Sequence, residues 1–515
     1  MNLLGMEALV FGSVAFFALL LALVAIGAFT AYRNRQGPTL VALSAADHTL
    51  AVRRKEVEDA ETRLRELRPL LVDADKKSAE VAWLEQRRSE LATCIAKLEA
   101  RIIEIGGTGA DDSDADKLED LRKMPAALGY LERAADVSIP NDDRSESAYL
   151  HRAADWIRDA GLNYPPRTLR ALHTSFKIAQ EAPITVLSGI SGTGKTQLPR
   201  AYAQAMGMGF LPVPVQPRWD SPQDLLGFYN FIEKRFKATD LARAMWRLDI
   251  WRERASASKD DPIFDDRMLL VLLDEMNLAR VEYYFSEFLS RLELRPRPSE
   301  TANPDRRLGA EIVIDIPGAE PLRMFPGHNL LFVGTMNEDE TTQALSDKVL
   351  DRGAMLRFPA PLKLAEAPAA GQPPLVAPLS RRVWEGWRRE PAAMGEADRS
   401  RAKRIVDDLS KTMKDLGRPF GHRVGQAMLA YAANYPDAGD RPVSTLSMAM
   451  ADQVEMRLLP KLRGLELDQA AADMDRLALY VREELQDDRL AEAIDASVAD
   501  SADASGRFAW SGLAR

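Results

Sequence analysis

Cysteine and histidine are scarce in this chain, and their scarcity excludes several kinds of protein. The 515 residues include one cysteine, Cys94, which excludes a disulfide framework within the chain and a cysteine-based zinc site. The five histidines are scattered and show no metal-ligand spacing. The sequence also lacks a nucleophile elbow, a protease zinc motif and the carboxylate cluster of a nuclease. No effector chemistry of these kinds is therefore visible.

An excess of basic residues is absent too. Lys and Arg number 68 against 77 Asp and Glu, for a net charge of -9. This balance argues against a protein whose whole surface coats nucleic acid, although a local basic pore or stripe is compatible with it. Hydrophobic residues at 46% and charged residues at 28% are ordinary for a globular chain. The length predicts about three domains.

The first segment has no charged side chain over residues 8–32. About 20 apolar residues span a bilayer as a helix, so this run predicts a transmembrane anchor within residues 1–35. Glu7 precedes the run and Arg33 and Arg35 follow it, and positive residues stay on the cytoplasmic side. We expect a single-pass protein of the inner (cytoplasmic) membrane with its body in the cytoplasm. A cleaved signal peptide, the alternative, would have a basic start and a shorter apolar core.

Residues 44–105 are charged and periodic. Apolar residues such as Leu67, Val81 and Ile95 recur at multiples of seven, which predicts a coiled coil, with Pro69 as a kink. A single amphipathic helix lying on the body is the alternative. Residues 106–147 follow, rich in glycine and aspartate, and predict a flexible acidic linker. A short helix around Leu118 to Ala135 could interrupt this linker.

The strongest motif begins after an apolar strand at Ile184 to Leu187. The pattern G-x-x-x-x-G-K-T then runs through Gly189, Ile190, Ser191, Gly192, Thr193, Gly194, Lys195 and Thr196, and a helix-like stretch follows. Backbone N–H groups of such a loop wrap phosphate oxygens, and the helix N-terminus adds its dipole. Lys195 is expected to neutralise the β- and γ-phosphates, and Thr196 to ligate Mg²⁺.

Two further strands end in polar residues. The first is an apolar run from Met268 that leads into Asp274 and Glu275. Asp274 is expected to hold the Mg²⁺ shell, and Glu275 to activate the attacking water. The second runs from Asn329 to Thr335 and leads into Asn337, whose amide could orient the same water.

Three stretches together resemble AAA+ ATPases of the McrB-like group: SGISGTGKTQLPRAYAQ, LLDEMNLARVEYYFSEFLSRLE and FVGTMNEDETTQALSDKVLDRGAMLRF. The resemblance implies an α/β fold, with a parallel sheet flanked by helices over residues 148–360 and a small all-α lid. It also implies a homo-oligomeric ring, usually a hexamer, with nucleotide sites between subunits. The matching position for an arginine that acts on the neighbouring subunit is Arg352. The alternative is a surface arginine paired with Asp347 or Asp351.

The remaining segments are expected to carry less chemistry. Residues 361–397 are rich in proline and alanine and predict a linker. Residues 398–466 resemble the AAA+ lid, in which Arg423 would reach back to the phosphates. Residues 467–515 predict a C-terminal helix and a mobile tail, in which Phe508 and Trp510 could dock on a partner.

The expected function is a membrane-anchored ATPase, with GTP as a possible alternative nucleotide and Mg²⁺ as the metal. By resemblance it would be the motor of a McrBC-like restriction or antiphage defence system that works with a separately encoded nuclease or effector. Contact with nucleic acid would then be indirect. Two alternatives stay open: a MoxR-like chaperone that remodels proteins, and a nucleotide-gated membrane scaffold.

Overall fold

The computed structural model describes residues 117–135, 137, 144–162, 164–231, 233–251, 264, 266–317, 319–337, 345–359, 375–436 and 444–513. The expected membrane span, the expected coiled coil and the first part of the expected acidic linker lie outside these residues. Among the helices of the described part, none is both long and apolar enough to cross a bilayer.

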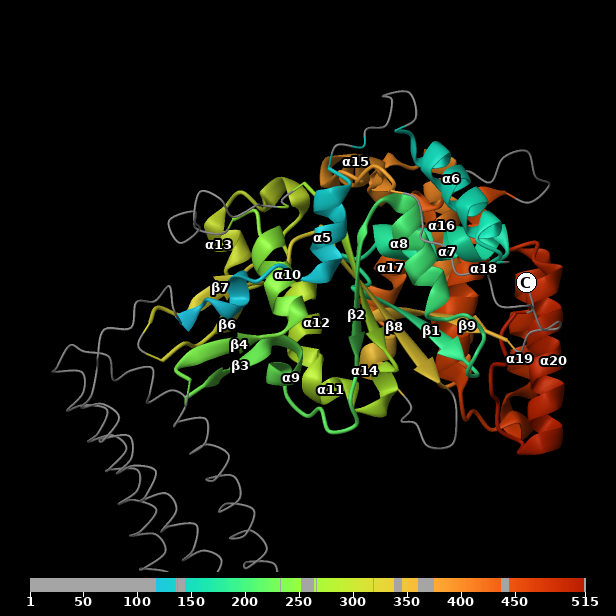
Figure 1. The fold of residues 1–515 in the computed structure, drawn as a ribbon. Coiled ribbons are helices and arrows are strands. Elements are labelled where there is room, and N and C mark those ends of the chain that lie inside the picture. Colours follow the sequence, from blue (N-terminus) through green and yellow to red (C-terminus); the bar gives the residue numbers. More distant parts are fainter. Residues whose placement is uncertain are drawn as a thin grey trace, which may run out of the picture. The chain divides into compact units, whose positions relative to one another are not determined.

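The centre of the described chain is a five-stranded sheet whose paired strands all run parallel. Their spatial order is β2 (Gly209–Pro214), β5 (Leu269–Asp274), β8 (Leu330–Asn337), β1 (Ile184–Gly189) and β9 (Gly353–Phe358). This arrangement confirms the predicted α/β class (Figure 1).

Both faces of the sheet are covered, which explains the unbroken apolar run of β5. Leu270 and Leu272 point into one core, shared with helices on that side, while Val271 between them is equally buried on the opposite face. On that opposite face, Phe285 and Phe288 lie with their rings 5.8 and 5.0 Å from the ring of Phe332 in β8. The sheet is thus the middle layer of three.

Helices on both sides of the sheet come from the predicted core segment and its flanks (Figure 1). They are α5 (Ala126–Arg133), α6 (Glu146–Asp159), α7 (Pro166–Lys177), α8 (Gln197–Met206), α9 (Pro222–Leu226), α10 (Asp240–Leu248), α11 (Val281–Tyr284), α12 (Ser286–Glu293), α13 (Pro304–Arg307) and α14 (Asp347–Leu350).

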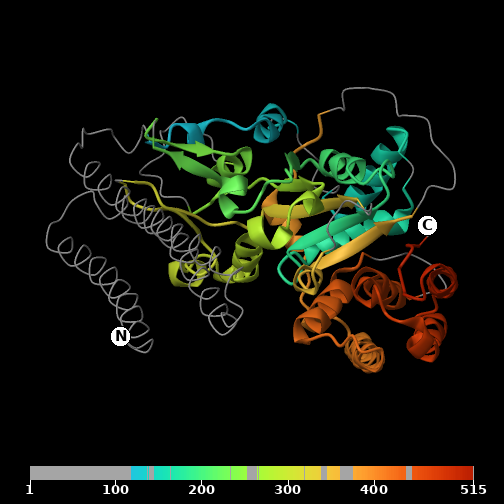
Figure 2. The same cartoon turned by 90° about the horizontal axis from the view of Figure 1, so that it is seen from below.

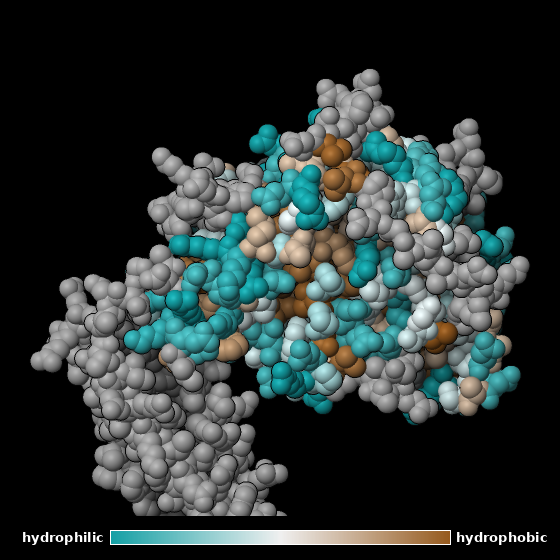
Figure 3. All heavy atoms as spheres, in the orientation of Figure 1, coloured by the Kyte–Doolittle hydropathy of each residue, from teal (hydrophilic) through white to brown (hydrophobic). Residues whose placement is uncertain are grey.

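Strand β2 forms one edge of the sheet. Its exposed residues include Pro212 and Pro214, which have no N–H to offer to another strand and so protect the edge from pairing. Figure 3 shows hydrophobic residues gathered near the middle of this face, close to β2, with hydrophilic residues around them.

Two further sheets have two strands each. Strand β3 (Gly227–Asn230) pairs with β4 (Arg235–Ala238), and β6 (Ile312–Ile314) pairs with β7 (Leu322–Met324). The strands of the second pair lie on either side of Pro317 in the sequence. The tips of both belong to a separate compact unit, which includes Tyr229–Arg235 and Val313–Arg323.

The C-terminal part is helical and packs as one group beside the sheet (Figure 2). Helix α15 (Arg381–Trp387) packs instead on α7 and α6, through Trp384 and Trp387. The group consists of α16 (Glu396–Asp415), α17 (His422–Asn434), α18 (Thr445–Gln453), the π-helical turn η8 (Val454–Leu458), the 3₁₀ turn η9 (Leu459–Leu462), α19 (Leu467–Glu483) and α20 (Asp488–Ala504). We call this group the helical bundle.

The structure bears on three of the expected segments. The short helix expected within the acidic linker is confirmed as α5, which packs on β2. The expected Pro/Ala-rich linker contains α15, whose Trp384 and Trp387 are buried in the core. The expected mobile tail is wrong: after α20, Phe508 and Trp510 are 1% and 3% exposed. In each case the deciding feature is a few large apolar residues, which outweigh a polar or proline-rich composition.

Candidate functional site

The loop after β1 has the shape of a phosphate cradle. Its glycines adopt backbone conformations that side chains rarely permit, with φ of 141° at Gly189 and 87° at Gly194. A Cβ at Gly189 would lie 2.3 Å from the carbonyl oxygen of Phe358, and one at Gly194 would lie 2.6 Å from the hydroxyl of Tyr164. Glycine is therefore required at both positions. The loop leads into the N-terminus of α8, where the helix dipole favours an anion.

Lys195 folds back over this loop. Its Nζ donates hydrogen bonds to the carbonyl oxygens of Gly189, at 2.9 Å, and of Ile190. The residue is only 6% exposed, so the cation is held inside the loop by backbone dipoles. This position suits a cation that is to meet phosphate oxygens.

The ends of β5 and β8 meet the loop through hydroxyl groups. Thr196 donates its Oγ1 hydrogen to Oδ1 of Asp274 at 3.0 Å, and Thr335 donates to the same oxygen at 2.6 Å. Thr335 also accepts the backbone N–H of Glu275 at 2.9 Å. A single buried hydroxyl in β8 therefore orients both acidic residues at the end of β5.

Glu275 itself is exposed and sits in a left-handed backbone conformation, with φ of 54° and ψ of 46°. Such a conformation costs of the order of 1–3 kcal/mol in a residue other than glycine, and it is found mainly at functional sites. Its Oε1 accepts a hydrogen bond from Nδ2 of Asn337 at 3.1 Å. The backbone oxygen of Asn337 in turn accepts one from Nδ2 of Asn277 at 2.8 Å. The amide and the carboxylate are thus aimed at each other.

Tyr164 closes the loop from the side. Its hydroxyl donates to the carbonyl oxygen of Gly194 at 2.9 Å. Burial raises the pKa of Tyr164 to about 12, so the hydroxyl keeps its proton at neutral pH. Sequence reasoning missed Tyr164, because it lies 30 residues before Gly194 in no motif. It missed Thr335 as well, although a lone hydroxyl in an apolar strand was a usable signal.

The structure therefore brings most of the expected site residues together at one edge of the sheet. Parallel strands present their carboxyl ends at the same edge, and the register pairs Gly189 with Asn337 across β1 and β8. Every residue from Gly189 to Thr196 is in the loop, and Asp274, Glu275 and Asn337 lie at the ends of the neighbouring strands.

The two expected arginines lie elsewhere. Arg352 immediately precedes β9, whose first residue, Gly353, pairs with Ile184 at the amino end of β1. Five residues of strand separate that end from Gly189, a distance of about 16 Å at about 3.3 Å per residue. Nε of Arg352 is 3.2 Å from Oε1 of Glu293, and Nη2 of Arg423 is 3.4 Å from the other oxygen of the same carboxylate.

The structure shows neither of the pairings considered for Arg352, with Asp347 or with Asp351. The partner of Arg352 is Glu293 of α12, whereas Asp351 pairs with Lys461 of the helical bundle. Arg423 does not contact the phosphate loop of its own chain. It pairs with Glu293, the same carboxylate that pairs with Arg352. Sequence reasoning missed Glu293, because one more glutamate at a helix end carries no distinctive signal.

The donor set fits the nucleotide and metal expected from the motifs. A hydroxyl and a carboxylate oxygen, on Thr196 and Asp274, lie 3.0 Å apart beside the loop. Mg²⁺ prefers such oxygen ligands and takes few of them from the protein, because substrate phosphates and water complete its shell. A buried ammonium and a helix N-terminus stand next to them for the phosphates.

The sheet, the loop after β1 and the acidic pair after β5 define an α/β core of the phosphate-binding-loop kind. A family model described as "Domain of unknown function (DUF8727)" matches residues 383–502, which correspond to most of the helical bundle. No curated protein matches the chain. Among solved structures, a "putative ATPase" from Cytophaga hutchinsonii is similar at 14% identity with a TM-score of 0.35, over 57% of this chain and 81% of that one. A likeness this distant carries no argument on function.

Proposed function

We propose that this chain is a nucleotide hydrolase, an ATPase with GTP as a possible alternative substrate, which works at the loop after β1. One observation carries the proposal: a continuous set of hydrogen bonds links Thr196 in the loop, Asp274 and Glu275 at the end of β5, and Asn337 at the end of β8. A loop with a purely structural role would not require these features together. They are the glycine-rich loop, the pair of oxygen ligands on Thr196 and Asp274, and the hydrogen bond between Glu275 and Asn337.

Each residue then has a task that follows from its position. The loop and Lys195 bind the β- and γ-phosphates, and Thr196 and Asp274 hold Mg²⁺, which offsets the charge on those phosphates. Glu275 accepts the proton of the attacking water. The hydrogen bond from Asn337 occupies Oε1 of Glu275 and fixes the orientation of the carboxylate. The other oxygen, Oε2, can then accept the proton of the water.

The position of Arg352 favours action on a neighbouring subunit. Because its side chain lies at the amino edge of the sheet, it is about 16 Å along β1 from its own loop. Phosphoryl transfer spreads negative charge over the γ-phosphate, and an arginine supplied from outside can accelerate it by about 10³–10⁵-fold. We propose that Arg352 serves the next subunit of a homo-oligomeric ring, for which a hexamer is the expected size.

The wider role proposed rests on the sequence. The uncharged run at residues 8–32 supports a membrane anchor, and the resemblance of the motifs supports a motor of a McrBC-like defence system with a separate nuclease or effector. Fractionation tests the anchor: the full chain should sediment with membranes, and a chain lacking residues 1–35 should not. Co-purification of a nuclease-fold protein would support the defence role.

Two variants test the hydrolase. Lys195→Ala should abolish nucleotide binding, because the loop loses the cation at its centre. Glu275→Gln should bind nucleotide normally while turnover falls by about 10²–10⁴-fold, because only the proton acceptor is lost. Lys411→Ala and Glu287→Gln, both at exposed positions, are the matched controls and should behave as wild type. Normal turnover by Glu275→Gln would refute the assignment, and a wild type that binds without hydrolysing would favour the scaffold.

A further inference from the structure

Glu293 is shared by two arginines that come from distant parts of the chain. It is the last residue of α12, and its two carboxylate oxygens face Arg352, before β9, and Arg423, at the start of α17. Arg352 and Glu293 are half-buried, with side chains 13% and 17% exposed, whereas Arg423 is 50% exposed. Nη1 of Arg352 also donates to Oγ of Ser290, on the same helix, at 3.4 Å.

The contact between Glu293 and Arg352 is an ion pair without hydrogen-bond geometry. The two charged atoms are within 3.2 Å, yet the N–H of Nε does not point at the oxygen well enough to bond. Such a contact fixes a position through charge and leaves the carboxylate able to shift between its two partners. Within the described residues, one carboxylate balances two guanidinium groups here, so the trio keeps a net positive charge that suits an incoming anion.

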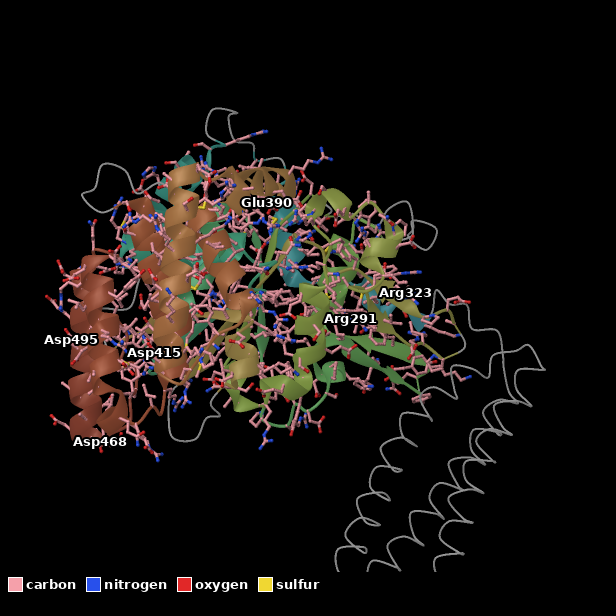
Figure 4. The ribbon with its side chains drawn as sticks, turned by 180° about the vertical axis from the view of Figure 1, so that it is seen from behind. Arg291, Arg323, Glu390, Asp415, Asp468 and Asp495 are labelled. Carbon is pink, nitrogen blue, oxygen red and sulfur yellow. The ribbon has the colours of Figure 1, made fainter. Side chains whose placement is uncertain are left out.

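A second ion pair ties the same place to the helical bundle. Asp351, the neighbour of Arg352, pairs with Lys461 of η9. The turn that carries Arg352 is therefore linked to the bundle twice, directly through Asp351 and indirectly through Glu293 and Arg423. Seen from behind, Arg291 marks the end of α12 that bears Glu293, and Asp415, Asp468 and Asp495 mark the bundle (Figure 4).

We propose that Glu293 is the positioning residue of Arg352 and that Arg423 of the helical bundle competes for its carboxylate. The position of the bundle in one subunit then sets how Arg352 is presented to the neighbouring subunit. This inference rests on the proposed hydrolase and on Arg352 acting in trans. Glu293 does not touch the reacting atoms in this scheme; it acts through Arg352 alone.

The first test is Glu293→Gln in the full chain, with Glu287→Gln on the same helix as the control. A misplacement of about 1 Å in a catalytic group can cost about 10²-fold in rate, so we expect kcat to fall by about 10- to 100-fold, with KM within about twofold. Glu287→Gln should leave both unchanged, because Glu287 is 59% exposed and, among the described residues, pairs only with Arg291 of its own helix. A normal kcat for Glu293→Gln, while Glu275→Gln is inactive, would overturn the inference and leave the hydrolase standing.

The second test asks whether Glu293 acts through Arg352. Subunits with Glu293→Gln keep their base, and subunits with Glu275→Gln keep a well-placed arginine, so mixing the two should restore part of the activity. Mixing Glu293→Gln with Arg352→Ala should restore none, because neither supplies a working arginine. Restoration in both mixtures, or in neither while mixed rings form, would overturn the positioning role. If Glu293→Gln does not fold, Glu293→Asp takes its place, because it keeps the charge and shortens the reach.

The third test concerns Arg423. If it acts on Arg352 through Glu293, then Arg423→Gln should change kcat in the wild-type background and cause no further change in the Glu293→Gln background. Additive effects of the two substitutions on kcat would show that Arg423 works independently of Glu293, and the proposed competition would be wrong.

Discussion

The hydroxyl of Thr335 offers the sharpest test of how the site is built. The substitution Thr335→Val keeps the shape of the side chain and removes two hydrogen bonds at once, one to Oδ1 of Asp274 at 2.6 Å and one from the backbone N–H of Glu275 at 2.9 Å. Because Thr335 is 2% exposed, water cannot easily replace either bond. The change should therefore affect both stability and turnover.

The magnitude follows from the two bonds. A bond to a charged acceptor contributes about 1.5–3 kcal/mol and a neutral one about 1 kcal/mol, while the extra buried methyl group of valine returns about 0.8 kcal/mol. The free energy of unfolding should fall by about 2–3 kcal/mol. Turnover should fall by about tenfold or more, because Asp274 loses a partner and the backbone of Glu275 is no longer held.

Thermal unfolding and steady-state hydrolysis, measured on the same preparations, check this prediction. Thr335→Ser is the matched control, because it keeps the hydroxyl and loses only a methyl group, so its turnover should stay close to wild type. If Thr335→Val melts and hydrolyses like wild type, the hydroxyl does not organise Asp274 and Glu275, and the reasoning fails.

Three other perturbations have definite expected outcomes. Tyr164→Phe should weaken nucleotide binding several-fold in an equilibrium titration, because the bond to Gly194 is lost; equal weakening at pH 7 and pH 9 is expected, since the pKa of Tyr164 is about 12. Arg352→Ala and Glu275→Gln should each be inactive alone and partly active when mixed; mixed rings without activity would exclude a role in trans. Trp510→Ala should destabilise the bundle by about 3–5 kcal/mol in denaturant unfolding, and a change under about 1 kcal/mol would mean that the buried ring contributes little.

The phosphate loop and the polar residues that end β5 and β8 could be predicted from the sequence, because their conformations depend on residues close by in the chain. A phosphate loop needs glycines at fixed spacing, and a strand buried on both faces is a continuous apolar run, so β1 and β5 and the residues that follow them were visible. Asn337 followed from the same pattern in β8. These signals depend on neighbours in the chain and need no knowledge of tertiary contacts.

The partners of those residues could not be predicted, because they depend on contacts far apart in sequence. Thr335 is 61 residues from Asp274, and Tyr164 is 30 residues from Gly194. The prediction of a mobile tail within residues 467–515 was wrong for a related reason. The alanine, serine and aspartate composition of this segment indicates mobility, yet Phe508 and Trp510 are buried in the apolar core together with side chains of the helical bundle. Composition averages over a segment, whereas burial is decided by single large side chains.

Strand β9 runs between the two edges of the sheet at which Arg352 and the phosphate loop lie. The strand has six residues; it begins beside Arg352, and its last residue, Phe358, places a carbonyl oxygen against Gly189 of the phosphate loop. A Cβ at Gly512, near the end of the C-terminal segment, would lie 3.2 Å from the side chain of Arg357 in β9. The segment after α20 therefore touches β9 close to the phosphate loop, through Gly512, and the helical bundle contacts the turn before β9 through Asp351 and Lys461. On the proposed function, β9 therefore gives a short, hydrogen-bonded connection between the phosphate loop of one subunit and the arginine that this subunit presents to the next.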